Sequence, residues 1–429
     1  MSRVRINCST LLNGIVSLPP SKSYTHRALV MASLADGESK IENPLLSGDT
    51  KATINACIAM GAQIRPVEHD MLVKGCSPKC ANDIVNVENS GTTLRFMTSI
   101  YSLPPEGYTV LTGDASLRQR PMQPLLDALQ QLGVWAVSSR GNGSAPIIVK
   151  GGGIRGGLAR IRGDISSQYI SSLLISTPLA QKDTELLVSD AASKPYIDAT
   201  MHMLNYFGIK VEREEYTKFR VEAGQRFKSN NLRIPADFSS ASFIASAVAI
   251  AGGRVELIGA NTRMPQADSA ILNILEKMGC RIITQGASVI VESDGKILNG
   301  GSFDLRDSPD LLPVLSVLAL KCDREVSIYG VAHARYKETD RISVMAQEIS
   351  KLGVKVKERS DGLDILPAKE LRKEILYSHA DHRVFMALCL ASMMVDGGCE
   401  VEGAETADIS YPNFLRDIAD IGVKVERIN

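Results

Sequence analysis

The chain has 429 residues, 44% of them hydrophobic, which predicts two or three domains with full hydrophobic cores. Lys and Arg together number 48, and so do Asp and Glu, so the chain lacks the long-range positive field of a non-specific nucleic-acid or membrane-surface binder. Any anion site must therefore be built from a local cluster of cations.

The cysteines are scattered and show no Cys-x-x-Cys or Cys/His zinc spacing, so we expect reduced thiols in a cytoplasmic protein. Residues 1–10 lack the apolar stretch of a signal peptide, and the longest apolar run, 311–320, is too short to span a membrane. The eight thiols belong to Cys8, Cys57, Cys76, Cys80, Cys280, Cys322, Cys389 and Cys399.

One pattern recurs six times: a helical run with apolar residues three and four apart, then a glycine, then a short alternating strand. A helix often ends in a left-handed residue, a conformation that costs glycine no steric penalty. The repeats cover 54–64, 125–137, 201–211, 271–283, 344–356 and 414–425, and their glycines are Gly61, Gly133, Gly208, Gly279, Gly353 and Gly422.

Six such units suggest two domains of three units each, in a mixed α/β (α+β) fold. Pro, Asn and Ser interrupt the apolar periodicity near 18–20 and 228–235, where we place the crossings between domains. We therefore expect a discontinuous domain I, 1–20 with 235–429, and a domain II, 21–234. The pattern does not give the strand order.

Polar segments lie between these elements. Residues 20–27, Pro-Ser-Lys-Ser-Tyr-Thr-His-Arg, precede an apolar helix at 28–34, where free N–H groups favour an anion. Residues 89–95 have the same character, and 118–122 predict a third basic helix start with Pro121 in its first turn. Each segment alone is equally compatible with a capped helix and solvated charges.

The later polar segments mix neutral donors with dense charge. Residues 166–168 and 193–196 suit phosphate oxygens or ordinary caps. In 335–341, Lys337 and Arg341 are four residues apart, which predicts one shared helical face. Asp310 and Asp381 each precede an apolar helix, where a carboxylate can serve simply as a cap.

Two motif matches are rejected. Residues 151–156 satisfy G-x-G-x-x-G but are followed by a strand-like stretch at 158–162, so we expect a hairpin turn and not a dinucleotide site. Residues 379–382 contain two His but lack the helix and carboxylate of a zinc protease. The sequence contains no P-loop and no G-x-S-x-G.

Taken in order, the polar segments closely resemble those of the EPSP synthase family over nearly the whole chain. The resemblance implies an inside-out α/β barrel fold, with six βαβαββ units, three per domain, and an active site in the cleft between the domains. It also implies transfer of the enolpyruvyl (1-carboxyvinyl) group of phosphoenolpyruvate to the 5-hydroxyl of 3-phosphoshikimate, in the shikimate pathway to chorismate and aromatic amino acids. No metal or cofactor, and no partner beyond these two small molecules, is implied for what we expect to be a monomer.

The resemblance also implies residue roles. The catalytic set is Lys22, Asp310, Lys337 and Glu338. The 3-phosphoshikimate set is Lys22, Ser23, Arg27, Ser166, Ser167, Gln168, Ser193, Tyr196, Asp310 and Lys337. The phosphoenolpyruvate set is Lys22, Asn89, Gly91, Arg120, Gln168, Arg341 and Arg383.

Two positions depart from the family's pattern: Ile409 stands where the family has Lys, and His333 where it has Asn. Neither belongs to the proton-transfer set, so we expect altered affinity and not a changed reaction. Two alternatives stay open, a UDP-N-acetylglucosamine enolpyruvyl transferase and a catalytically silent anion-binding relative.

Overall fold

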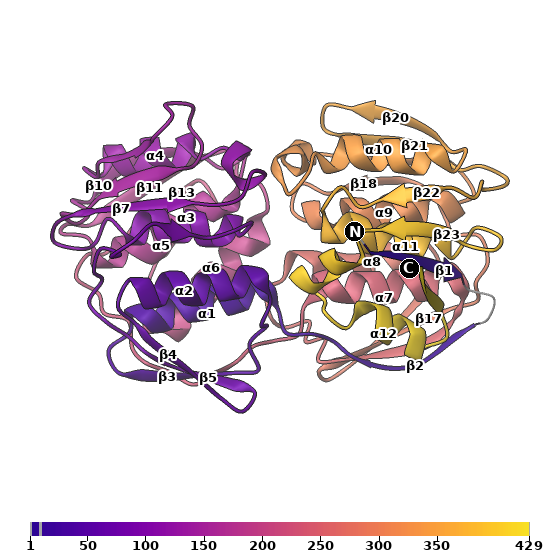
Figure 1. Ribbon diagram of the computed structural model, residues 1–429, viewed down its shortest axis with the longest axis horizontal. Coiled ribbons are helices and arrows are strands. Elements are labelled where there is room, and N and C mark those ends of the chain that lie inside the picture. The colour runs from indigo at the N-terminus through magenta and orange to yellow at the C-terminus, as the bar shows by residue number, and fades with distance from the viewer. Residues whose placement is uncertain (1, 8–10, 429) are drawn as a thin grey trace. The chain divides into compact units, whose positions relative to one another are not determined.

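The computed structural model describes residues 2–7 and 11–428, so Cys8 lies outside the described residues. The chain divides into two compact units: unit 1 is Met1–Pro19 with Pro235–Asn429, and unit 2 is Pro20–Ile234. Among the described residues each unit contains three four-stranded sheets with helices packed on them (Figure 1). The cysteines other than Cys8 are free thiols.

Every sheet follows one plan, in which an edge strand runs parallel to its neighbour and the other two strand pairs are antiparallel. In four of the six sheets a helix directly connects the parallel strands, because a parallel pair needs a crossover, and in the other two the edge strand comes from a distant part of the chain. A second helix leads into the antiparallel edge strand of each sheet. The unit is therefore βαβαββ, and the predicted mixed α/β fold with six such units is confirmed.

The repeats of unit 2 are β14 (Leu232–Arg233), α1 (Lys22–Leu34), β3 (Glu38–Glu42), α2 (Gly48–Ala59), β4 (Gln63–Val67), β5 (Asp70–Lys74); β6 (Val85–Asn86), α3 (Gly91–Ile100), β7 (Tyr108–Thr112), α4 (Gln123–Gln131), β8 (Ala136–Ser138), β9 (Ile147–Lys150); and β10 (Gly157–Arg162), α5 (Ser167–Ser176), β11 (Thr184–Ser189), α6 (Lys194–Tyr206), β12 (Glu212–Glu214), β13 (Lys218–Val221). The first repeat takes its edge strand from the end of the unit, where β14 pairs with β3.

The repeats of unit 1 are β2 (Leu12–Ser17), α7 (Phe238–Ala251), β15 (Gly253–Ile258), α8 (Ala270–Lys277), β16 (Arg281–Gln285), β17 (Ser288–Ser293); β18 (Ser302–Asp304), α9 (Leu312–Leu318), β19 (Val326–Tyr329), α10 (Arg341–Lys351), β20 (Lys355–Arg359), β21 (Gly362–Leu366); and β22 (Ile375–Tyr377), α11 (His382–Ser392), β23 (Cys399–Glu402), α12 (Phe414–Asp420), β24 (Lys424–Ile428), β1 (Arg3–Asn7). The N-terminal strands β1 and β2 pair with strands that come after residue 235.

The first helix of each repeat is buried almost all round. In unit 1, α7, α9 and α11 pack on one another, and every residue of α9 and α11 is buried. Helices that are apolar on all sides are typical of a protein interior, so these three form the core and the sheets cover them (Figure 1). In unit 2, α1, α3 and α5 hold the equivalent place in the repeats.

The glycines predicted to end the second helices do so. All six have positive φ, between +81° at Gly208 and +120° at Gly422. At Gly279 the N–H donates to Glu276 O at 3.0 Å and the following N–H donates to Leu275 O at 2.9 Å, the bond pair of a Schellman C-cap. The glycine after each apolar helical run was therefore sufficient to predict where these helices end.

Two predictions about loops are wrong. The segment 151–156 is not a hairpin, because β9 pairs in one sheet and β10 in another, and the segment joins the two. Its glycines allow close backbone contact, since a Cβ on Gly156 would lie 2.1 Å from Lys182 O. The segment 118–122 is not a helix start either, because α4 begins at Gln123 and Pro124 takes the first-turn position.

Among the described residues, no helix combines the length and the apolarity needed to cross a membrane.

The glycine caps give a stability prediction. Gly279→Ala should lower the free energy of unfolding by about 1–2 kcal/mol, because an L residue is strained at φ +107°. Its new Cβ would meet only Asn299 Nδ2, at an ordinary 3.4 Å, so packing adds little. Gly301→Ala, in the same unit with open space and no positive φ, is the control and should stay within about 0.5 kcal/mol. Urea unfolding followed by circular dichroism measures both, and equal values would contradict the account.

Candidate active site

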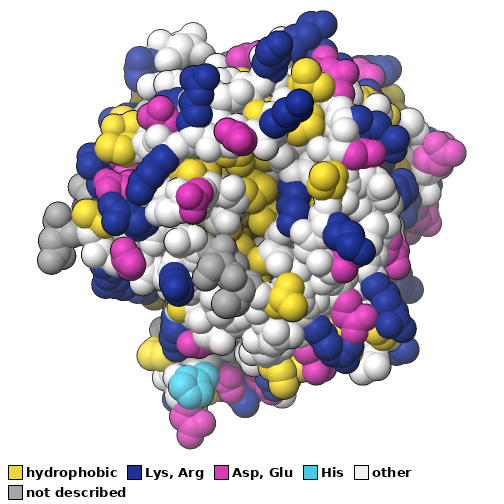
Figure 2. All heavy atoms as spheres, turned by 90° about the vertical axis from the view of Figure 1, so that its right-hand side faces the viewer, with side chains coloured by type: hydrophobic (Ala, Val, Ile, Leu, Met, Phe, Trp, Pro, Cys, Tyr) yellow, Lys and Arg dark blue, Asp and Glu magenta, His cyan; other side chains and the backbone are white. Residues whose placement is uncertain are grey.

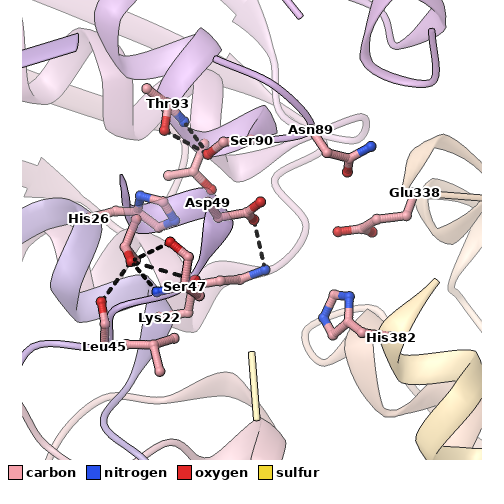
Figure 3. Close-up of polar contacts among 12 residues, drawn as sticks. Lys22, His26, Leu45, Ser47, Asp49, Asn89, Ser90, Thr93, Glu338 and His382 are labelled. Carbon is pink, nitrogen blue, oxygen red and sulfur yellow. Dashed lines mark hydrogen bonds and ion pairs between the residues drawn. The ribbon is translucent and has the colours of Figure 1, made fainter. Parts of the chain in front are cut away.

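Unit 2 places Lys22 at the start of a helix. Ser21 accepts a hydrogen bond from Tyr24 N, so α1 begins at Lys22, six residues before the start of the helix predicted for 28–34. The Lys22 ammonium lies 3.1 Å from Asp49 Oδ2, in the first turn of α2 (Figure 3). Sequence reasoning missed Asp49, because a carboxylate in a first helical turn is an ordinary capping signal.

Arg27 is buried and held by neutral acceptors. Its guanidinium donates to Thr200 Oγ1 at 2.8 Å and, at 3.0 Å each, to the carbonyl oxygens of Ser23 and Tyr196. Burial lowers the pKa of Arg27 to about 10, with Tyr24 and other neighbours acting in the opposite direction. The structure thus brings Ser23 and Tyr196, two residues predicted for 3-phosphoshikimate, to the guanidinium of Arg27, and the oxygens that accept these hydrogen bonds are uncharged.

A second basic group surrounds the start of α3. Ser90 caps this helix, and Arg120 donates to Asn89 Oδ1 at 2.7 Å while Asn89 donates to Asp114 Oδ2 at 2.7 Å. A Cβ on Gly91 would lie 3.0 Å from an Arg95 nitrogen and 3.1 Å from an Arg120 nitrogen. The absence of a side chain at Gly91 thus leaves room for two guanidinium groups at the helix N-terminus, which by itself favours anions.

Gln168 joins α5 to α3. Its amide donates to Thr92 Oγ1 at 2.8 Å and its amide oxygen accepts from Arg95. Ser166 caps α5 by accepting from Gln168 N, and Ser167 is buried in the first turn. Gln168 therefore lies next to the basic group at Gly91.

Ser193 takes an unusual conformation before α6. Its φ of +55° and ψ of +40° are left-handed, and no side-chain cap bond is formed. Non-glycine residues in this region cost of order 1–3 kcal/mol and cluster at functional sites. Tyr196, three residues on, supplies the carbonyl that orients Arg27.

A buried chain of hydrogen bonds that the sequence did not indicate links three helices of unit 2. His26 Nδ1 lies 2.6 Å from Thr53 Oγ1, which lies 2.6 Å from Thr93 Oγ1, which lies 2.6 Å from Ser90 Oγ. Burial and the charges of Lys22 and Arg27 hold the pKa of His26 well below its ordinary value, so its ring is neutral. The chain connects α1 and α2 to the cap of α3, where Figure 3 shows the contacts between Ser90 and Thr93.

Unit 1 holds a dense ionic cluster around Arg341, whose side chain is 1% exposed. The guanidinium pairs with Asp310 at 2.7 Å, Glu338 at 2.8 Å and Asp381 at 2.7 Å. These carboxylates raise the pKa of Arg341 against the opposing effect of burial, so it stays charged. Figure 3 labels Glu338 and His382 of this unit.

Asp310 is the point where the cations of unit 1 meet. Its Oδ1 accepts from Arg341 and lies 3.3 Å from the Lys337 ammonium, and its Oδ2 lies 3.1 Å from Arg383. Burial lowers the pKa of Lys337, while Asp310 opposes the shift. The residues predicted from the second half of the chain, Asp310, Lys337, Glu338, Arg341 and Arg383, therefore form one cluster.

The predicted shared helical face of Lys337 and Arg341 is wrong. Asp340 caps α10 by accepting from Ser343 N, so the helix begins at Arg341 and Lys337 lies outside it in extended backbone. The two cations meet through Asp310 instead. Asp381 is indeed a cap, accepting from Arg383 N at 2.8 Å, but it also pairs with Arg341.

Asp268 joins this cluster and was missed, because it sits in a short 3₁₀ turn, Ala267–Ser269, with no motif around it. It is 2% exposed, accepts a hydrogen bond from Ser239 and lies 3.7 Å from Arg383. Burial, and next the charge of Asp310, raise the pKa of Asp268 to about 7.

The two departures from the family pattern lie in unit 1. His333 is buried in the 3₁₀ turn Ala332–Tyr336, and Ile409 is half-buried at the end of the turn Ala404–Ile409. Within the described part of the chain, no group of three or more His, Cys, Asp or Glu side chains is arranged to hold a metal ion.

A separate pocket of about 880 Å³ in unit 1 contains no predicted site residue. Leu11, Ile250, Leu320 and Met393 are among the residues that line it. Figure 2 looks onto unit 1 and shows hydrophobic side chains in a hollow bordered by Lys and Arg. This pocket is distinct from the ionic cluster at Asp310.

The cluster gives a second stability prediction. Asp381→Ala removes a fully buried partner of Arg341 and the cap of α11, and should cost about 3–5 kcal/mol of unfolding free energy. Asp381→Asn keeps an oxygen for the cap and should cost less. Asp396→Ala, an exposed carboxylate in the same unit, should change stability by no more than about 0.5 kcal/mol. Chemical denaturation measures the unfolding free energy of each of the three variants. A loss for Asp381→Ala as small as that for Asp396→Ala would refute the stabilising role given to the Asp381 carboxylate.

This chain is similar to known proteins of one family over nearly its full length. The sequence matches the family EPSP synthase (3-phosphoshikimate 1-carboxyvinyltransferase) over residues 6–418. A 3-phosphoshikimate 1-carboxyvinyltransferase of Methanocaldococcus jannaschii is 43% identical over 97% of each chain, and one of Methanocella arvoryzae is 44% identical over 96% of this chain and 97% of that one. The solved EPSP synthase of Acinetobacter baumannii superposes with a TM-score of 0.84 at 25% identity, covering all of both chains. The chain therefore belongs to the EPSP synthase family.

Proposed function

We propose that this chain transfers the 1-carboxyvinyl group of phosphoenolpyruvate to the 5-hydroxyl of 3-phosphoshikimate, releasing phosphate. The observation that carries the proposal is the cluster in which Asp310 contacts Lys337, Arg341 and Arg383. It joins cations for an anionic substrate to acid and base groups for proton transfer. Membership of the family, and relatives named for this activity, support the same conclusion. The reaction belongs to the shikimate pathway to chorismate and aromatic amino acids.

The substrates set an electrostatic requirement. At neutral pH a phosphate monoester carries about −1.5 to −2 and a carboxylate about −1, so the two substrates together bring roughly −5 to −6. Desolvating such charges costs several kcal/mol per ion unless they are paired. The proposed cations, three in each unit, are Lys22, Arg27, Arg120, Lys337, Arg341 and Arg383.

Unit 2 supplies the anion contacts assigned from the first half of the chain. Arg27 is oriented by neutral oxygens, so its charge is available to a substrate anion. The groups proposed for 3-phosphoshikimate here are Lys22, Ser23, Arg27, Ser166, Ser167, Gln168, Ser193 and Tyr196. Those proposed for phosphoenolpyruvate are Lys22, Asn89, Gly91, Arg120 and Gln168.

Unit 1 supplies the proposed proton chemistry. Glu338 gives a proton to the methylene carbon of phosphoenolpyruvate, which makes the adjacent carbon electrophilic. The 5-hydroxyl attacks that carbon and its proton passes to Asp310 or Lys337, 3.3 Å apart. The bond from that carbon to the phosphate oxygen then breaks, phosphate leaves with the bonding electron pair, and the Glu338 carboxylate takes a proton from the methyl group, which restores the double bond.

The position of Lys337 in this cluster affects how readily its ammonium gives up a proton. Burial lowers the pKa of Lys337, so its ammonium gives up a proton more readily than one in water. Arg341 contacts both Asp310 and Glu338 and fixes their separation. We therefore assign Arg383 and Arg341 to the anion and leave proton transfer to Asp310, Lys337 and Glu338.

The test is phosphate release from protein mixed with 3-phosphoshikimate and phosphoenolpyruvate. Lys22→Ala and Glu338→Gln should each lower kcat/KM at least about 100-fold, because one removes an anion contact and the other a proton donor. Lys296→Ala and Glu276→Gln, both at exposed positions, are the matched controls and should keep wild-type rates.

The outcomes separate the alternatives. Release that requires both substrates and falls only in the first two variants supports the proposal. Folded wild-type protein that binds both substrates without release is the silent anion-binding relative, with Ile409 the first position to change back to Lys. The comparisons support 3-phosphoshikimate and not a UDP-sugar as acceptor.

We also propose that the chain acts as a cytoplasmic monomer. The described cysteines are free thiols, as expected in a reducing compartment. One chain carries the complete proposed set of substrate ligands, so a second copy need not contribute a residue.

A further inference from the structure

Asp268 is a buried carboxylate that the proposed reaction does not use. Its side chain is 2% exposed, and among the described residues Oδ1 has no hydrogen-bond partner. Buried polar atoms are nearly always paired, so an orphan oxygen beside a substrate-binding arginine requires an explanation. An unpartnered oxygen costs less in a neutral carboxylic acid than in a carboxylate, because charge is what water solvates most strongly.

The surroundings of Asp268 come from several elements. Ser239 of α7 donates to Oδ2, and Arg383 of α11 lies 3.7 Å from the same oxygen. Negative charge reaches it from Asp310 in the turn Pro309–Leu311 and from Asp237, the cap of α7. Asp268 therefore faces the guanidinium of Arg383 at 3.7 Å and the negative charges of Asp310 and Asp237.

Asp310 and Asp268 compete for Arg383 on unequal terms. Asp310 lies 3.1 Å from Arg383 and also contacts Arg341 and Lys337. Asp268 is farther from Arg383 and has the unpaired oxygen. When one carboxylate of the pair takes a proton, the geometry favours Asp268.

We propose that Asp268 is a positioning residue for Arg383 that takes up a proton from solvent when a substrate anion binds there. The inference rests on the proposed assignment of Arg383 to phosphoenolpyruvate. An incoming anion adds negative charge beside Asp268 and so favours its neutral form. By linkage, neutral Asp268 leaves more of the Arg383 charge to the anion and tightens binding. With the proton on Oδ2, the Ser239 hydroxyl turns to accept.

The pH dependence follows with a definite sign. The pKa of Asp268 is raised to about 7, so the group is neutral below that pH and charged above it. The KM for phosphoenolpyruvate at saturating 3-phosphoshikimate should rise as pH increases through 7. Asp268→Asn imitates the neutral form, so the ratio of wild-type to variant KM should increase about fivefold or more between pH 6 and 8.5. The ratio cancels titration of the substrate itself.

A ratio that stays constant with pH would overturn the proposal, because a purely structural role changes KM by a pH-independent factor. Ser239→Ala gives a second test if Asp268→Asn does not fold. Losing this hydrogen bond to the carboxylate should move the midpoint of the KM profile to higher pH. Ser246→Ala, a buried hydroxyl on the same helix with no partner among the described residues, should leave it unchanged. A Ser239→Ala midpoint equal to wild type would also overturn the proposal.

Failure of this inference is distinguishable from failure of the proposed function. Absence of phosphate release by the wild type contradicts the function, whereas release with an unchanged pH profile contradicts only the role of Asp268. Calorimetry with phosphoenolpyruvate, in two buffers that differ in ionisation enthalpy, counts protons without turnover. The wild type should take up more protons than Asp268→Asn at pH 8, since titration of the substrate itself is common to both, and equal counts would overturn the proposal.

Discussion

A guanidinium buried as fully as that of Arg341 needs close polar partners, and in unit 1 three carboxylates are those partners. Removing an ion from water costs several kcal/mol, which only close pairing returns. Asp310, Glu338 and Asp381 supply this pairing from three separate segments. Because Asp381 also caps α11 and Asp310 also binds Lys337 and Arg383, the same contacts position the groups assigned to chemistry.

Unit 2 meets the same requirement differently. Arg27 is surrounded by a hydroxyl and two carbonyl oxygens, which orient its charge without cancelling it. Lys22 lies 3.1 Å from the carboxylate of Asp49, which a substrate phosphate can replace. A chain with no net charge can thus concentrate positive charge locally. In unit 2 the hydrogen-bond partners of Arg27 are uncharged. In unit 1 the carboxylates are held in a fixed arrangement that we also assign to proton transfer.

The sequence was most informative where the signal is local. Six glycines marked six helix ends, because a left-handed residue after a helix strongly favours glycine. It misled where structure depends on partners distant in the chain. The strand-like alternation on both sides of residues 151–156 predicts a hairpin, and only the strand pairing shows that these strands belong to different sheets. The spacing of Lys337 and Arg341 predicts one helical face, because spacing alone does not reveal that Asp340 is the cap.

The candidate site also divides into residues that the sequence could indicate and residues that it could not. The resemblance of the motifs to the family indicated Asp310, Lys337, Glu338, Arg341 and Arg383, and the structure brings them into one cluster. Sequence could not indicate Asp49, His26 or Asp268, since a single polar residue in a helix or turn has no pattern of its own. Their importance arises from burial and from neighbours supplied by other repeats.

The central claim is that the reaction proceeds by protonating the methylene carbon of phosphoenolpyruvate and later removing a methyl proton. Turnover in D₂O, with the product examined by proton NMR and mass spectrometry, tests it most directly. The account predicts deuterium in the vinyl methylene of the product, because the methyl group formed in the intermediate contains one solvent-derived hydrogen. Product free of deuterium at that carbon would contradict addition and elimination, and with it the role given to Glu338.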